Sequence, residues 1–493
     1  MKKWLLVSVL IMTFANAKEL DITKGMFRAS FENVTISPSE NMGLFGISYL
    51  LSPNEYFYYG MSVYGTLTGV RGGFFVGGFN AGVKYPLYKK LSVDAGVFAG
   101  GGGGGSAPQG GGLMLKSYAG GVYEFSDYSL GLNYSYITFP NGNIDSSQVS
   151  IVVDKNFETL FVEELLDIEI LKKYSYENQN DYIVATSQIY FPKNGTKKTN
   201  GVSPLNQNIK LLGIEYGFDV SKDFVAYIET AGALGGDSTG YMEVLGGVAY
   251  SYDVGKDVDI GARISLGSAG GGRVNTGGGA VSKSSLFMNY RPTKSLTTGL
   301  GIGYYHAFEG NFDAPIVKVE IGLTPDFLTL GGSKNSKVFD SFASQKFNLR
   351  LSHQTYFYSE NLSPRNDGVP IQLIGGKLDW FLTDSFYLSG EALAAYKGGA
   401  GGYATGQFGL GYMQEVFYDF SLVGEVNIGA AGGGSLQTGD GLIAQPMLGV
   451  SYAINDKIAL EVLGGKIIAL NGPLDTEVLD LSFVYRFNKL VQK

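Results

Sequence analysis

A glycine-rich segment occurs three times in this chain of 493 residues. The three copies read GGGGGGSAPQGGG, GSAGGGRVNTGGG and GAAGGGSLQTGDG, and they occupy positions 100–112, 267–279 and 429–441. They align without a gap, and their starts are offset by 267 − 100 = 167 and 429 − 267 = 162 residues. A repeat of that length is a domain-sized unit rather than one turn of a solenoid. The chain is therefore predicted to be a triplication, with the glycine segment at the same place in each copy.

The N-terminus has the pattern of a secretory signal peptide. Two lysines precede an apolar stretch that ends near Phe14, and an A-x-A cleavage site follows at Ala15 and Ala17, before Lys18. The apolar stretch is too short to cross a bilayer as a helix. Cleavage after Ala17 is predicted, and the absence of cysteine fits an exported protein.

The composition favours a membrane β-barrel. No run of about 18 apolar residues follows the signal, which excludes a helical membrane protein. Tyrosine (33), phenylalanine (31) and glycine (73) are abundant, while charged residues make up only 17%. This combination is typical of transmembrane β-barrels, with a secreted β-solenoid or a fibrous surface protein as the alternative. The net charge of −8 argues against a nucleic-acid partner.

Alternating patterns predict eight strands in each copy. The clearest alternation covers 128–139, where large apolar or aromatic residues occupy every second position. The turns form two sets: short polar turns on the side of the N-terminus, and glycine segments and longer loops on the opposite, outer side. We therefore expect an all-β protein, an antiparallel transmembrane β-barrel built from a triplicated eight-stranded unit.

The repeats set the predicted domain boundaries. Apolar residues at helical spacing in 158–173 predict a short amphipathic helix within the first linker. The predicted segments are the signal peptide 1–17, barrel repeat 18–157, linker 158–180, barrel repeat 181–327, linker 328–344, barrel repeat 345–488 and C-terminal tail 489–493.

The strands could close as one barrel or as three. A single barrel of 24 strands (3 × 8) would be roughly 45–50 Å across and would need a plug, a partner or infolded loops, none of which is apparent. Three eight-stranded barrels with filled interiors avoid that leak. We favour three small barrels, with the single large barrel as the alternative.

Charged residues recur at equivalent strand positions of the copies and are candidates for the barrel lumens. Because buried charges must be paired, we expect them to form a polar core rather than a binding or conducting lining, which is the alternative. These candidates are Lys116, Glu229, Arg263, Lys283, Glu391 and Glu425.

The sequence has few features of a metal, phosphate or cofactor site. The chain has two histidines, His306 and His353, and no cysteine, so a histidine-based metal site is not expected. The glycine segments open no helix and are followed by no Lys-Ser or Lys-Thr, so they are not phosphate loops. No cofactor is predicted. The alternating aromatic residues Phe483, Tyr485 and Phe487 near the C-terminus resemble the signal that delivers outer-membrane barrels to their assembly machinery.

Two segments carry a family resemblance. GGGLMLKSYAGGVYEFSDYSLGLNYSYITFPNGNID and GGGAVSKSSLFMNYRPTKSLTTGLGIGYYHAFEGNFD resemble the last strands of outer-membrane lipid A 3-O-deacylases. The resemblance implies an eight-stranded barrel unit and, in that family, a His-x-Ser pair with an acid that cleaves an acyl ester. Here His306 is followed by Phe308 in the serine position, and the other copies have no histidine at the equivalent place. Without a serine next to a base there is no activated nucleophile, so no enzyme activity is expected.

Together these patterns predict an exported protein of the bacterial outer membrane. The expected role is structural or binding, or that of a narrow channel. The alternatives are a large, partner-gated pore for transport or secretion and, third, a degenerate lipid A deacylase-like enzyme. The expected partners are outer-membrane lipid or lipopolysaccharide and the barrel-assembly machinery.

Overall fold

A computed structural model describes residues 21–37, 39–161, 176–221, 223–330, 342–357 and 368–492. The predicted signal cleavage site at Ala15, Ala17 and Lys18 lies outside these residues. Within them, every regular element is a strand, and no helix is long and apolar enough to cross a membrane.

The first repeat folds into a closed antiparallel barrel. Closure occurs because β1 pairs with β2 on one side and with β8, the last strand of the repeat, on the other. The eight strands are β1 (Asp21–Ser37), β2 (Glu40–Ser52), β3 (Phe57–Thr68), β4 (Phe75–Tyr88), β5 (Leu91–Gly103), β6 (Met114–Glu124), β7 (Tyr128–Thr138) and β8 (Asp145–Phe161).

The second repeat closes in the same way, because β10 pairs with both β11 and β17. Its strands are β10 (Tyr182–Tyr190), β11 (Ile209–Ser221), β12 (Phe224–Gly235), β13 (Met242–Asp253), β14 (Val258–Gly270), β15 (Ala280–Thr293), β16 (Leu296–Ala307) and β17 (Asp313–Leu323).

The third repeat closes through the pairing of β19 with β20 and β26. Three closed eight-stranded barrels are thus present, and the alternative of one 24-stranded barrel is wrong, since each repeat's first strand pairs with its own last strand. The strands of the third barrel are β19 (Phe342–Tyr356), β20 (Ile371–Phe381), β21 (Phe386–Lys397), β22 (Ala404–Phe417), β23 (Phe420–Gly432), β24 (Leu442–Ala453), β25 (Ile458–Ala469) and β26 (Asp475–Gln492).

The alternation of the sequence separates the inside of each barrel from the outside. In β7, Ser129, Asn133 and Ser135 are buried in the lumen, whereas Leu132 and Tyr134 are 59% and 62% exposed on the outer wall. This arrangement of apolar residues outside and polar residues inside is that of a barrel surrounded by lipid. Each of the eight strands that form a barrel is hydrogen-bonded to two neighbours, so the barrels themselves have no open sheet edge.

The linkers begin and end at other residues than the sequence predicts. Residues 158–161 belong to β8 instead of starting a helix, and the rest of the expected helix lies outside the described residues. Residues 489–492 continue β26 instead of forming a free tail, because they pair with residues 342–345 of β19. Lys489 also places its ammonium over the ring of Phe327, 4.6 Å from the centroid.

Two short strands lie in or beside the expected linkers. β9 (Tyr176–Asn180) pairs with β18 (Asp326–Leu330), and β18 pairs with β26 through Phe327 and Val491. The alternation of these five-residue strands was too brief to be recognised in the sequence. They attach the segments between repeats to the wall of the third barrel.

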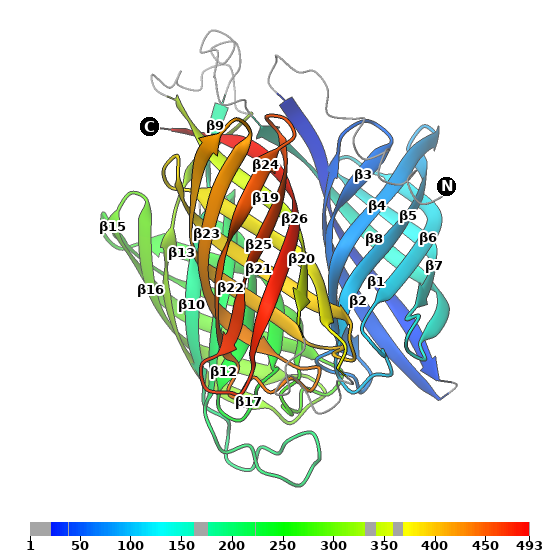
Figure 1. Cartoon of the computed structure of the whole chain (residues 1–493). Helices are drawn as coiled ribbons and strands as arrows, with labels where there is room; N and C mark the ends of the chain where they lie inside the picture. The colour runs from blue at the N-terminus through cyan, green and yellow to red at the C-terminus, as the bar shows by residue number, and fades with distance from the viewer. Residues whose placement is uncertain are drawn as a thin grey trace.

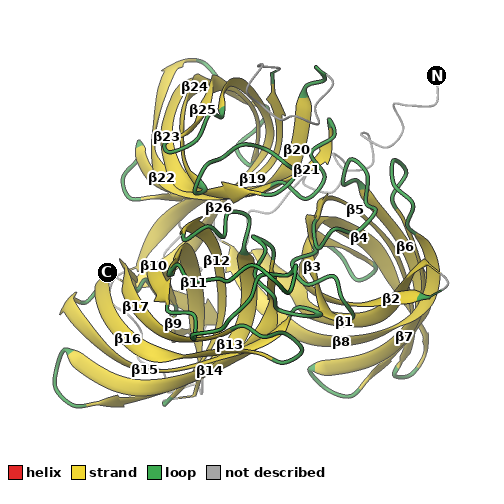
Figure 2. Ribbon diagram, turned by 90° about the horizontal axis from the view of Figure 1, so that it is seen from below, coloured by secondary structure: helices red, strands yellow, loops and turns green. Residues whose placement is uncertain are grey.

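The three barrels stand side by side around a common centre (Figures 1 and 2). β1 starts and β26 finishes at the upper end in Figure 1, which we call the terminal end. The glycine segments lie at the opposite end, which we call the glycine end. The third strand of each barrel contacts the fifth strand of the next: β3 contacts β14, β12 contacts β23, and β21 contacts β5. The contacts therefore close a ring with pseudo-threefold symmetry.

Candidate functional site

The lumen of the first barrel is filled by a buried ion-pair network. Arg28 donates from Nε to Asp154 Oδ1 at 2.7 Å and from Nη2 to Asp154 Oδ2 at 3.0 Å. Its Nη1 lies 2.9 Å from Asp94 Oδ2. Lys116, one of the predicted lumen charges, donates to Glu32. All five side chains are buried, so each charge has the partner that burial requires.

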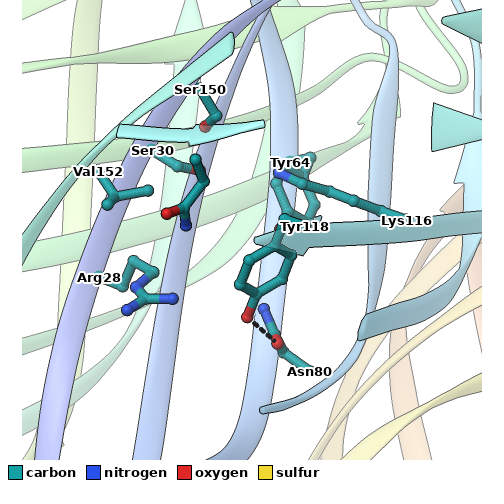
Figure 3. Close-up of a pocket in the computed structure, with 9 residues that line it drawn as sticks. Arg28, Ser30, Tyr64, Asn80, Lys116, Tyr118, Ser150 and Val152 are labelled. Carbon is teal, nitrogen blue, oxygen red and sulfur yellow. Dashed lines mark hydrogen bonds between the residues drawn. The ribbon is translucent and has the colours of Figure 1, made fainter. Parts of the chain in front are cut away.

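Tyrosines fill the space between these charges (Figure 3). The Tyr118 hydroxyl donates to Asn80 Oδ1 at 2.8 Å, and the Tyr58 hydroxyl donates to Asp94 at 2.6 Å. The cavity among Arg28, Asn80, Lys116 and Tyr118 has a volume of about 10 Å³. A cavity of that size holds about one water molecule, so the side chains around it are closely packed.

The second barrel contains a denser network. Lys283 Nζ lies 2.6 Å from Glu229 and 2.8 Å from Glu243. Lys318 Nζ lies 3.0 Å from the other oxygen of Glu229, which therefore bridges two cations. Arg263 completes the network through a hydrogen bond to Glu320 Oε2 at 3.0 Å.

The third barrel surrounds two cations with five carboxylates. Arg350 Nη2 lies 2.6 Å from Asp379, and the guanidinium also contacts Glu425 and Glu461. The second cation, Lys377, lies 2.8 Å from Glu391, 3.3 Å from Asp480 and 3.4 Å from Glu425. All seven side chains are buried.

The structure places all six predicted lumen charges inside the barrels, in contact with opposite charges. Sequence reasoning missed four cations of the same networks. Two of them, Arg28 and Arg350, occupy equivalent positions on the first strands of their barrels, but their offset of 350 − 28 = 322 residues differs from the 429 − 100 = 329 of the glycine segments, so a gapless alignment does not match them. These cations occupy inward-facing positions of their strands, which they share with small polar residues. That pattern was the signal that could have identified them. The missed cations are Arg28, Lys318, Arg350 and Lys377.

Outer loops close each barrel at the glycine end. In the first barrel, Phe74, Phe139 and Ile144 lie at the ends of hairpins and are at most 1% exposed. Phe74 and Phe139 pack edge to face with ring centroids 5.9 Å apart. Phe312 and Leu474 have the same role in the second and third barrels, where they belong to the buried clusters. Each lumen therefore has an apolar cap above its ionic layer.

The glycine segments form the contact between barrels, which we call the glycine hub. A side chain on Gly73 would place its Cβ 2.1 Å from the backbone nitrogen of Gly271. The equivalent pair Gly240 and Gly433 joins the second barrel to the third, with a Cβ-to-nitrogen distance of 2.9 Å. These glycines also have positive φ angles, +86° for Gly73 and +85° for Gly240. Both the conformation and the close approach require glycine.

Hydrogen bonds to backbone carbonyl groups hold the hub together. Gly72 donates to Gly277 O at 3.0 Å between the first and second barrels, and Gly402 donates to Gly102 O at 3.0 Å between the third and the first. Between the second and third barrels, the Thr239 hydroxyl donates to Gly439 O at 2.6 Å. At all three interfaces of the ring the acceptor is thus the backbone carbonyl of a glycine.

Aromatic residues join the barrels nearer the terminal end. Phe27 of the first barrel stacks on Phe218 of the second with centroids 6.4 Å apart. Phe161 of the first barrel meets Phe487 of the third at 4.9 Å. Phe487 belongs to the predicted assembly signal, and the structure places it, with Phe483 and Tyr485, in β26. The role of these three residues in assembly stays a prediction.

The two histidines lie apart. His306 faces outward from β16, and its Nδ1 lies 2.7 Å from Asp313 Oδ1. His353 is on β19, with its Nε2 2.9 Å from the Tyr396 hydroxyl. Among the described residues, no group of three or more His, Asp or Glu side chains could hold a metal ion.

Comparisons with known proteins do not assign the chain to a family. No family model matches the chain, and no curated protein matches it. Among solved structures it is similar to OccK11 (OpdR) from Pseudomonas aeruginosa, with 11% identity, 95% of this chain and 96% of that chain covered, and a TM-score of 0.23. It is also similar to the siderophore receptor PirA from Acinetobacter baumannii, with 7% identity, 96% and 81% covered, and a TM-score of 0.29.

The class of the protein follows from its own barrels. Transmembrane β-barrels have closed antiparallel strands, an apolar outer wall and a polar interior, and all three barrels have these features. The chain is an outer-membrane β-barrel protein that carries three complete barrels in one polypeptide.

Proposed function

We propose that this protein has a structural or binding role in the outer membrane and that its barrels do not conduct. The observation that carries the proposal is the filling of the lumens. Ion-pair networks cross all three barrels, and apolar caps lie above them. The outer wall and the glycine-end loops are then the surfaces available to ligands and partners.

Conductance across a planar bilayer tests this proposal. Refolded protein, inserted at neutral pH, is expected to give no discrete current steps, whereas an open porin in the same bilayer supplies the positive control. Insertion is verified by the resistance of the folded barrels to protease. Reproducible single-channel steps from inserted protein would contradict the proposal and establish the narrow-channel function instead.

A hydrolytic role is not proposed, although His306 has an acidic partner in Asp313. The position two residues after the histidine is Phe308, whose ring packs against the imidazole with centroids 5.3 Å apart. An ester hydrolase of this kind needs an activated nucleophile next to its base. Release of fatty acid from lipid A by the purified protein, abolished by His306→Ala, would show that this view is wrong.

A further inference from the structure

The outer wall of the second barrel has a groove of about 610 Å³. Two cross-strand rows form it: Ser284, Tyr304 and Pro315 lie opposite one another on β15, β16 and β17, and Leu286, Ile302 and Val317 form the next row toward the membrane centre. The short side chains of Ser284 and Pro315 in the first row leave the depression between larger side chains. Phe191, just after β10, supplies one side.

A polar row borders this groove at the glycine end. Ser282, His306 and Asp313 are cross-strand neighbours one row further along the same three strands. Lys193 reaches the same place, because its backbone nitrogen donates to Asp313 O at 3.2 Å. Its ammonium lies 4.9 Å from the centroid of the Tyr304 ring and 3.7 Å from Asp313 Oδ2. The groove therefore has an apolar floor and a cation at its outer end.

The Lys193 ammonium is available to another anion. Its side chain is 55% exposed, and 3.7 Å to Asp313 is longer than a hydrogen bond. A hydrogen bond to Tyr304 and the charge of Asp313 raise the pKa of Lys193, so it remains protonated at neutral pH. Of the two further lysines in the loop that follows, 191–208, Lys198 is buried and pairs with Asp237, so Lys193 is the cation that lies beside the polar row. The loop extends beyond the barrel at the lower end of Figure 1.

The other two barrels lack this combination. The equivalent polar row is Leu115, Thr138 and Asp145 in the first barrel. In the third barrel, Ile468 takes the place of the histidine beside Asp475. The acid is thus present in all three copies, but in the described residues only the second barrel has a histidine and a loop lysine beside it.

We propose that this groove binds an anionic lipid of the outer leaflet, with one acyl chain against Ile302 and Tyr304 and the phosphate at Lys193. The inference rests on the binding role proposed above and gives that role a ligand class. Long outer loops of bacterial barrels face outward, so the glycine end and its lysines lie at the outer leaflet. A groove of this volume is in the range of roughly 300–1,000 Å³ found for ligand sites. A cation at the headgroup level favours anionic over zwitterionic lipid.

Native mass spectrometry of the full chain in detergent tests the proposal, with dioleoyl-phosphatidylglycerol as the anionic probe and dioleoyl-phosphatidylcholine as the zwitterionic control. Ser284→Phe fills the groove, and Ser117→Phe makes the same change at the equivalent outward position of the first barrel. Lys193→Gln removes the cation, and Lys197→Gln removes a neighbouring charge of the same loop. A parallel titration with lipid A shows which anionic lipid is the better ligand.

Wild-type protein is expected to retain the anionic lipid in preference to the zwitterionic one. Ser284→Phe should abolish this retention and Lys193→Gln should lower it about fivefold, the effect of one basic residue near a membrane surface, while Ser117→Phe and Lys197→Gln should leave it unchanged. Equal retention of both lipids, or equal loss in Ser284→Phe and Ser117→Phe, would overturn the proposal. Neither result depends on conductance, so failure of this site is distinct from failure of the proposed function.

Discussion

Arg350 is completely buried in the third barrel among three carboxylates, Asp379, Glu425 and Glu461. Removing a charge from water is costly, and the attraction between partners offsets that cost only while all partners are present. The presence of such a network is therefore weak evidence that the barrel is especially stable, but strong evidence that the side chains in its lumen have one fixed arrangement. At the residue scale, the lumens are sensitive to the loss of any single cation.

Replacement of Arg350 by methionine should destabilise the third barrel by about 3–5 kcal/mol, because three buried carboxylates lose a shared cation. Lys466→Met is the matched control, since Lys466 and Asp475 form a pair that is more than half exposed, 52% and 55%. Trp380 on β20 reports unfolding of this barrel in guanidinium chloride by its fluorescence. Equal unfolding midpoints for the two variants would show that the buried network contributes no more to the stability of the barrel than the exposed pair does.

At the element scale, the hairpins of the glycine hub decide how the barrels stand together. In each barrel, the hairpin between the third and fourth strands and the hairpin between the fifth and sixth strands extend in opposite directions around the ring. They meet the corresponding hairpins of the neighbouring barrels through backbone atoms alone at Gly73, Gly271, Gly240 and Gly433. Close backbone contact without side chains leaves no space for substitution.

Gly73→Ala should loosen the hub between the first and second barrels, because the new methyl group would meet Gly271 and the φ of +86° is unfavourable for alanine. Gly246→Ala on β13 is the control, since a Cβ there meets nothing within 4 Å. Spin labels at Val70→Cys and Val202→Cys measure the separation by pulsed electron resonance, and the chain has no native cysteine. A distance distribution that stays as narrow in Gly73→Ala as in Gly246→Ala would contradict this account of the hub.

At the scale of the whole molecule, the protein is a ring of three similar barrels in one chain. Each interface joins a third strand to a fifth strand, so the interface is heterologous, and three copies close the ring. The offsets between hub glycines, 240 − 73 = 167 and 402 − 240 = 162, equal those of the repeat itself. The symmetry of the structure is therefore the symmetry of the triplication.

The sequence predicted the barrels well because alternation over ten or more residues is a strong signal. Tyr134 and Ser135 illustrate it, one on the outer wall and one in the lumen. The hub was not predicted, since a contact between distant repeats has no local pattern. The strands β9 and β18 were missed because five residues are too few to show a period.

Cross-linking of β1 tests the closure of separate barrels most directly. Ala29 and Val153 are partners on β1 and β8, so a double cysteine variant should form a cross-link with a short thiol reagent, identified by mass spectrometry of the joined peptides. The comparison variant pairs Ala29→Cys with Leu481→Cys on β26, the strand that β1 would adjoin in a single large barrel. The account predicts efficient cross-linking to position 153 and none to 481. Efficient cross-linking to 481 without cross-linking to 153 would contradict it.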